Sequence, residues 1–330
     1  MDSRECVERT LEFDGPCRIP HQVWVLPWAR DHYPEVVKRI QDEFPDDIIT
    51  SPGFCRTPPP GQGDRYAPGR SVDDWGCTFE NIQKGAIGEV KNPQLATWDQ
   101  VDEVRIPVER LSVDKAQVDA FCNKTDRFVL GAGFPRPFEQ LQFIRGTVNL
   151  YLDLMDQPEG LKILMKRMHD FYMKEFELWA ETAVDGLFIM DDWGSQNALL
   201  ISPKLWRQVF KPLYRDYTEI ARAHGKYVFM HSDGYIVDIM EDLVEIGIHA
   251  INSQVFCMGI DKLSERFSGR ITFWGELDRQ QLLPAGTRQE VLDAMQAMRN
   301  GLYRKGGLIH QFEFGLGANP DNVLAACQAW

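Results

Sequence analysis

Five short apolar runs in the C-terminal half of the sequence end in residues that bind metals or move protons. The runs are 186–190, 227–230, 249–251, 271–274 and 308–312. The residues that end them are Asp191 and Asp192, His231 and Asp233, Asn252 and Gln254, Glu276, and Glu313, in that order. Catalytic groups of a parallel barrel lie where strands run into their following loops. We therefore expect these side chains to share one site.

Four of these residues suit a metal ion. His231, Asp233, Glu276 and Glu313 offer one imidazole nitrogen and several carboxylate oxygens. That donor set fits a divalent metal such as zinc, with a position open for substrate. Glu276 and Glu313 also accompany strongly apolar runs, where a charged group is costly unless it is paired or binds a metal. The sequence predicts a metal site formed by these four residues.

The other polar residues are expected to act on the substrate. Asp191, Asp192 and Glu276 are predicted to donate a proton or to orient the substrate. The predicted substrate contacts are Arg136, Trp193, Asn252 and Gln254. A structural interpretation stays open as well, because either aspartate can cap a helix or tie down a loop. His310 is expected to be structural.

Several well-known catalytic motifs are absent. The sequence has no GxSxG elbow, no HExxH pair and no phosphate-binding P-loop. Residues 131–133 form a GxG without the third glycine of a dinucleotide fingerprint, which is weak evidence for a nucleotide site. Nucleophilic serine chemistry and nucleotide binding are therefore not indicated.

The elements that must position these residues alternate between strands and helices. Eight short runs rich in Val, Ile and Phe are typical of buried parallel strands. They are 23–26, 47–50, 127–130, 186–190, 227–230, 249–252, 271–274 and 308–312. Helices are predicted over 203–224 with Ser202 as N-cap, from Thr287 with Glu290 in a capping box, from Asn319, and over much of 137–184 with a break near Pro158.

This alternation predicts an α/β fold, a distorted (β/α)8 TIM barrel, with residues 1–330 as a single domain. The long gap between the second and third strands predicts an insertion over 51–126. An open, doubly wound sheet is the structural alternative.

Composition excludes several classes of protein. The 330 residues carry 36 basic and 49 acidic side chains, a net charge of −13. No nucleic-acid partner and no anionic membrane surface is expected, because both need a positive field. No stretch approaches the roughly 18 apolar residues of a membrane span, and the N-terminus has no signal-peptide pattern. Seven cysteines without a CxxC pair indicate reduced thiols, so a cytoplasmic location is expected.

Much of the sequence resembles the uroporphyrinogen decarboxylase superfamily. The segments that carry the resemblance are GLFIMDDWGSQNALLISPKLWRQVFKPLYRDY, GKYVFMHSDG and DLVEIGIHAINSQ within 186–254, then FWGELDRQQLLPAGTRQEV and PDNVLAA, with DDWGC at 73–77 and PFEQLQFIRGTVNLYLDLMDQPE at 137–159. The resemblance implies a distorted (β/α)8 barrel. It also implies one of two chemistries.

The first chemistry is cofactor-free decarboxylation of uroporphyrinogen. That branch has an arginine pair after the first strand, where this sequence offers only Arg30 in VWVLPWARDHYPE. It also has a histidine in a GHG turn after the last strand, where this sequence reads EFGLG. Both departures weigh against a tetrapyrrole decarboxylase.

The second chemistry is that of zinc-dependent methyltransferases that work with a corrinoid protein. Their metal site resembles a His-x-Cys pair plus a later cysteine. Here His231 matches the histidine, Asp233 replaces the cysteine, and Glu313 lies beside the aligned position held by Phe314. Carboxylates in place of thiolates make a harder site, suited to coordinating an ether or hydroxyl oxygen.

The resemblance thus implies a demethylating methyltransferase. It would take a methyl group from a small methoxylated or methylamine-type donor and pass it to the cobalt of a corrinoid (cobalamin) held by a partner protein. The main alternative is a cofactor-independent decarboxylase of a carboxylated ring. A tetrapyrrole-binding protein and an unrelated metal hydrolase are further alternatives, and a homodimer is left open.

Overall fold

Eight parallel strands form the centre of the computed structural model, which describes residues 1–330. The strands are β1 (His21–Val25), β2 (Ile48–Thr50), β6 (Phe128–Leu130), β7 (Gly186–Met190), β8 (Tyr227–His231), β9 (Ala250–Asn252), β10 (Thr272–Trp274) and β11 (Leu308–Phe314). Their order across the sheet is β1-β11-β10-β9-β8-β7-β6-β2, so chain order runs around the barrel. All eight predicted strands are confirmed within two residues at each end.

β1 and β2 are the two edge strands of the sheet, and they do not pair through β-sheet hydrogen bonds, so the barrel is nearly but not fully closed between them. Instead, Asp47 N donates to His21 O at 3.0 Å. The Gln22 side-chain amide donates to Ile48 O at 2.9 Å, and Val23 N donates to the Asp46 carboxylate at 2.8 Å. The predicted distorted (β/α)8 barrel is confirmed, and the open doubly wound sheet is wrong.

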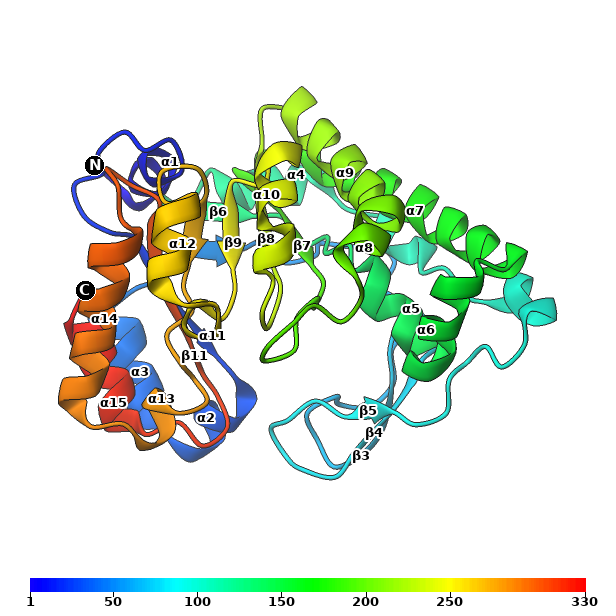
Figure 1. The fold of residues 1–330 in the computed structure, drawn as a ribbon, viewed down its shortest axis with the longest axis horizontal. Helices are drawn as coiled ribbons and strands as arrows, with labels where there is room; N and C mark the ends of the chain where they lie inside the picture. The colour runs from blue at the N-terminus through cyan, green and yellow to red at the C-terminus, as the bar shows by residue number, and fades with distance from the viewer.

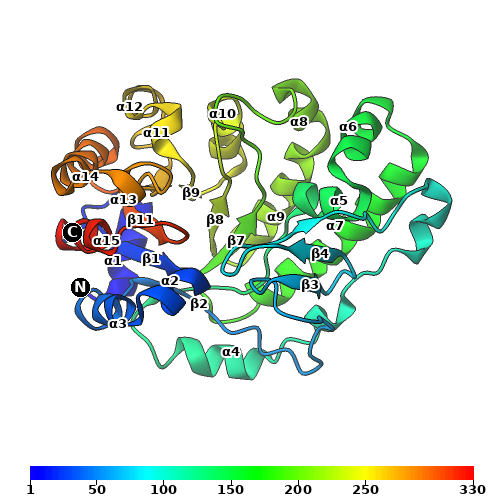
Figure 2. The same cartoon turned by 90° about the horizontal axis from the view of Figure 1, so that it is seen from below.

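Helices surround the strands (Figure 1; Figure 2). They are α1 (Ser3–Leu11), α2 (Pro27–His32), α3 (Pro34–Glu43), α4 (Lys115–Cys122), α5 (Pro137–Arg145), α6 (Thr147–Asp156), α7 (Glu159–Ala180), α8 (Pro203–Val209), α9 (Lys211–Ala223), α10 (Val237–Ile246), α11 (Val255–Met258), α12 (Ile260–Phe267), α13 (Leu282–Ala285), α14 (Arg288–Leu302) and α15 (Pro320–Gln328). Two 3-10 helices cover Trp98–Glu103 and Val108–Leu111. No helix is both long enough and apolar enough to cross a membrane.

The predicted helix caps are confirmed. Ser202 accepts from Leu205 N at the start of α8, and Thr287 and Glu290 form the reciprocal capping box of α14. The predicted single helix over 203–224 is wrong, because it is divided at Phe210 into α8 and α9. Pro212 has no N–H to donate, so the helical bonding pattern cannot pass through it.

Residues 51–126, between β2 and β6, contain the barrel helix α4 and, before it, an insertion beside the barrel mouth. They contain the small antiparallel sheet of β3 (Gly69–Val72), β4 (Thr78–Asn81) and β5 (Glu89–Val90), which lies apart from the barrel strands (Figure 1). Trp75 is buried against Phe171 and Tyr172 of α7. Arg110 binds Glu175 of α7 through two hydrogen bonds of 2.7 and 2.8 Å. These contacts fix the insertion to the barrel wall.

His310 provides a test of the fold that is independent of the site. It lies on β11, is 4 % exposed, and neither ring nitrogen has a hydrogen-bond partner. Burial, assisted by the charges of His21 and Arg299, lowers the pKa of His310 to about 3.

Because its unfolded-state pKa is near 6.5, unfolding takes up a proton between about pH 3 and 6.5. Stability contributed by neutral His310 is therefore lost as pH falls through that window, by ~1.4 kcal/mol per pH unit. We expect His310→Met to flatten the acid limb of a stability-against-pH curve measured by urea denaturation. An unchanged slope would contradict this account of the buried imidazole.

Candidate active site

Three neighbouring strands bring the site residues together at the carboxyl end of the barrel. In the register of the sheet, Met190 of β7 lies beside His231 of β8, and His231 lies beside Asn252 of β9. Asp192 and Asp233 follow the ends of β7 and β8 by two residues each. The parallel register thus brings side chains 40 residues apart in sequence to one edge, as predicted.

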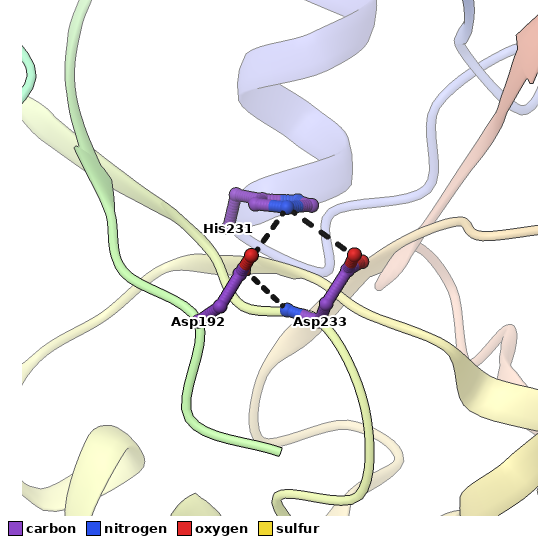
Figure 3. A group of neighbouring side chains, drawn as sticks. All are labelled: Asp192, His231 and Asp233. Atoms are coloured by element: carbon purple, nitrogen blue, oxygen red, sulfur yellow. Dashed lines mark hydrogen bonds and ion pairs between the residues drawn. The ribbon is translucent and has the colours of Figure 1, made fainter. Parts of the chain in front are cut away.

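Asp192, His231 and Asp233 form a compact cluster, drawn in Figure 3. His231 Nε2 lies 3.4 Å from Asp192 Oδ1 and 3.7 Å from Asp233 Oδ1. Asp233 N also donates to Asp192 Oδ1 at 2.9 Å, which fixes the two turns relative to each other. Both carboxylates therefore face the same ring nitrogen (Figure 3).

Asn252 fixes the orientation of the His231 ring. Its side-chain N–H groups donate to Trp274 O and, at 2.8 Å, to Gln311 Oε1. Its Oδ1 therefore faces His231 Nδ1, at 2.6 Å. This oxygen can only accept, so Nδ1 carries a proton and Nε2 is left to face the aspartates. Asn252 was predicted to contact substrate, but the structure places it behind the histidine.

The two carboxylates of the cluster favour a positive charge on the imidazole between them. Burial alone would lower the pKa of His231, but its contact with Asp192 and the charges of both aspartates outweigh burial and raise the pKa to about 10. Burial likewise opposes ionisation of Asp192, yet the contact with His231 lowers the pKa of that carboxyl. A proton on the imidazole therefore offsets the charge of Asp192, and Asp233 is shared between His231 and Arg279.

A divalent metal ion fits the same three atoms. The ligand atoms all lie within 4.8 Å of one another. Two ligands about 2.1 Å from a tetrahedral zinc ion are themselves ~3.4 Å apart, close to the distances in the cluster. Asp233 Oδ1 is buried and has no hydrogen-bond partner, so one ligand oxygen is free. Asn252 supplies the hydrogen bond behind the histidine that metal sites commonly have.

Glu276 and Glu313, which were predicted as ligands, lie instead around Arg279. The guanidinium Nε is 3.1 Å from Glu276 Oε1, and Nη1 is 3.3 Å from Glu313 Oε1. A third ion pair joins Nη2 to Asp233 Oδ2. Arg279 was not predicted, although an arginine three residues after Glu276 in the same loop is a signal for such a pair. It leaves Asp233 Oδ1 facing the cluster.

Asp191 and Trp193 lie away from the cluster, in the protein interior. Asp191 is fully buried and accepts from Phe138 N at 2.8 Å, Glu139 N at 2.7 Å and the Tyr214 hydroxyl at 2.6 Å. Those amides belong to the first turn of α5, so Asp191 caps that helix from outside it. Trp193 is fully buried and stacks on Phe138 with ring centroids 4.1 Å apart.

Two cavities flank the cluster at the barrel mouth. One, of about 530 Å³, lies between the insertion and the turn after β6, and its lining includes Arg136, Phe134, Phe143 and Arg65. We call it the insertion cavity. The other, of about 230 Å³, lies at the loops after β9 and β10, and its lining includes Gln254, Glu276 and Arg279. We call it the β10 cavity. Two predicted substrate contacts, Arg136 and Gln254, thus line different cavities.

A family model identifies most of this barrel. Residues 72–330 match the model described as "Uroporphyrinogen decarboxylase (URO-D)". This match covers well over half of the chain and includes the cluster and Arg279. The chain belongs to the uroporphyrinogen decarboxylase family. The resemblance found in the sequence is confirmed, and strands β1 and β2 of this family member lie before the matched region.

One solved structure shares the fold of this uroporphyrinogen decarboxylase family member at low sequence identity, and a second match is weaker. A methyltransferase from Methanosarcina mazei is 13 % identical, with a TM-score of 0.72, over 100 % of this chain and 98 % of that one. A 3-keto-D-glucoside 4-epimerase from E. coli is 12 % identical, with a TM-score of 0.41, over 72 % of this chain and 97 % of that one. No curated protein matches the sequence.

Proposed function

We propose that this protein is a zinc-dependent methyltransferase. It takes a methyl group from a small methoxylated or methylamine-type donor and passes it to the cobalt of a corrinoid supplied by a partner protein. The observation that carries the proposal is the His231–Asp192–Asp233 cluster, whose one nitrogen and two oxygens fit a zinc ion with an open position. Two findings support the proposal: the chain belongs to the uroporphyrinogen decarboxylase family, and it shares its fold with a methyltransferase.

The hard nature of the donor set points to an oxygen-bearing substrate. A methyl ether is a poor methyl donor because the oxygen that leaves carries negative charge. Bound zinc supplies a Lewis acid that stabilises that charge. Asp192, Asp233 and Nε2 of His231 would hold the ion, and the hydrogen bond from His231 Nδ1 to Asn252 leaves Nε2 facing the two carboxylates. Carboxylate ligands, unlike thiolates, favour an oxygen ligand in the remaining position.

Glu276 is suited to deliver a proton to the oxygen that leaves. It is 3 % exposed, and burial, opposed by Arg279, raises the pKa of its carboxyl to about 8. It therefore carries a proton near neutral pH, as a general acid must. Glu276 also lines the β10 cavity beside the cluster. Asp191, the other buried acid proposed from sequence, has both oxygens occupied by hydrogen bonds.

The insertion cavity is suited to hold the remainder of the donor. Its volume of about 530 Å³ lies in the range of small-molecule sites. Phe134 and Phe143 provide apolar walls. Arg136 lines the cavity; one of its terminal nitrogens contacts Met190 Sδ at 2.8 Å and its nearest carboxylate oxygen, on Glu139, is 3.8 Å away, so further N–H groups are left for a polar group of the donor.

Metal analysis and methyl transfer test the proposal together. We expect about one zinc ion per chain by plasma mass spectrometry of tag-free protein. The zinc-loaded protein should then transfer methyl groups from at least one member of a methoxylated panel to a reduced corrinoid protein, followed by the change in the cobalt absorption spectrum. If zinc supplied in excess does not bind, the metal-independent decarboxylase becomes the better hypothesis, with carboxylated rings as the substrates to test.

A further inference from the structure

The two cavities lie on opposite sides of the barrel mouth. In the eight-stranded order, β6 and β10 are four strands apart, which places the turn after β6 across the barrel from the loop after β10. The cluster follows β7 and β8, which lie between them in the sheet. The order around the barrel mouth is therefore the insertion cavity, the candidate metal site and the β10 cavity.

The charged groups of the β10 cavity are already paired within the chain. Arg279 binds three carboxylates, including those of Glu276 and Asp233. Asp278 Oδ1 accepts from Gln280 N and Gln281 N, both at 2.8 Å, and so holds the turn of the loop. No side-chain cation there is without a carboxylate partner, so the cavity has no obvious site for an anion.

Primary amides provide the remaining hydrogen-bonding groups. The cavity lining includes Gln196, Gln254, Gln280 and Gln281, which come from the loops after β7, β9 and β10. The side chains of Gln254 and Gln281 have no hydrogen-bond partner in the chain. Gln196 and Gln280 bind each other, Nε2 to Oε1, at 2.5 Å across the mouth. Each amide both donates and accepts, so this lining suits an uncharged ligand that carries several donors and acceptors, as a set of primary carboxamides does.

Transfer of a methyl group by direct displacement requires the donor and the acceptor to lie on opposite sides of the methyl carbon, so the two cavities can hold one each. The acceptor must approach the methyl carbon from the side opposite the oxygen that leaves. If the donor occupies the insertion cavity, as the proposed function requires, its leaving oxygen lies at the cluster and the acceptor reaches the methyl carbon from the direction of β10. Glu276, joined to Asp233 through Arg279, belongs to the side of the β10 cavity next to the cluster, within reach of that oxygen. A reduced corrinoid supplies the electron pair for the new Co–C bond. The electron pair of the broken C–O bond stays on the leaving oxygen, which then takes up a proton.

We propose that the β10 cavity is the acceptor subsite and that Gln254 and Gln281 bind carboxamide side chains at the edge of the corrin ring. The inference rests on the proposed function, since it takes the acceptor to be a corrinoid. It adds the side from which the ring arrives and the residues that recognise it. Gln196 and Gln280, paired above the same cavity, can exchange their mutual hydrogen bond for one to the ring edge.

Binding of hydroxocobalamin, without turnover, tests this subsite. Equilibrium dialysis with absorbance detection compares the wild-type protein with Gln254→Leu/Gln281→Leu. Loss of two amide hydrogen bonds is expected to weaken binding by about tenfold or more. The matched control is Gln289→Leu/Gln296→Leu, which removes two exposed glutamines of α14 that do not line the cavity. The control should bind like the wild type.

The outcomes separate this inference from the function on which it rests. Weaker binding by the cavity variant alone, with unchanged zinc content, supports the acceptor subsite. Equal binding by wild type and cavity variant overturns the subsite and leaves the methyltransferase proposal standing. A wild-type protein that binds no hydroxocobalamin at millimolar concentration overturns the subsite and counts against the corrinoid as acceptor, while the zinc measurement remains a separate test of the metal site.

Discussion

His231→Ala is expected to abolish zinc binding and methyl transfer while leaving the barrel folded. The imidazole supplies the only nitrogen of the cluster, and the two aspartates that remain would face each other without a cation-binding nitrogen between them. Loss of a metal ligand removes the Lewis acid, so we expect activity to fall by at least about three orders of magnitude. Plasma mass spectrometry and the methyl-transfer assay measure the two effects.

The fold should survive because His231 lies at the end of β8, outside the apolar core. Near-wild-type helix content by circular dichroism would show this. His32→Ala is a suitable control, since His32 is an exposed residue of α2 and is not part of the cluster. Asn252→Ala should give an intermediate result, with zinc affinity weakened by about 10- to 100-fold, because it removes only the hydrogen bond that orients the ring. Full activity in His231→Ala would refute the site assignment.

The barrel could be predicted from the sequence because each strand carries a local signal. A run such as GLFIM at 186–190 is apolar, short and rich in β-forming residues, and it needs no knowledge of its neighbours to be recognised. The caps at Ser202 and Thr287 are local signals of the same kind. The break at Phe210 was missed because the apolar periodicity over 203–224 continues through Pro212, although a proline interrupts the backbone bonding.

The site was harder to predict. The pairing of its side chains depends on distances between residues far apart in sequence, and no local pattern contains those distances. The strand ends correctly indicated His231, Asp233 and Asp192 as neighbours of one edge. Nothing in the spacing shows that Asn252 turns its oxygen toward His231. Nor does it show that Asp191, one residue from Asp192, turns inward to cap α5. Alternation of side chains along an extended segment accounts for the opposite directions of the two aspartates.

Arg279 is the clearest case of a residue whose importance only the structure reveals. The sequence predicted that Glu276 and Glu313, beside strongly apolar runs, need a positive partner, and the predicted partner was a metal ion. The partner in the structure is the guanidinium of Arg279, from the loop that carries Glu276 itself. Both interpretations satisfy the same electrostatic requirement, so they must be separated by removing the arginine.

Arg279→Met is expected to destabilise the metal-free protein by about 3–5 kcal/mol, the usual cost of leaving buried charges without their partner. Three carboxyl groups lose their cationic partner at once, and Glu276, which is only 3 % exposed, adds a buried charge to this loss once the pH exceeds its pKa of about 8. Urea denaturation in the presence of a chelator measures the loss. Arg39→Met, which breaks an exposed pair with Glu43 on α3, should cost no more than about 1 kcal/mol.

The destabilisation should depend on pH and on Glu276. Burial already raises the pKa of Glu276 to about 8 with Arg279 present, and removing the arginine, which lowers it, would raise it further. A folded-state pKa above the unfolded value makes stability fall as pH rises, so the variant should be weakest under alkaline conditions and recover on acidification. Adding Glu276→Gln should restore part of the loss, because the amide needs no counter-charge. If Arg279→Met instead leaves stability unchanged while Glu276→Gln and Glu313→Gln each remove zinc, the carboxylates are metal ligands, as the sequence alone predicted.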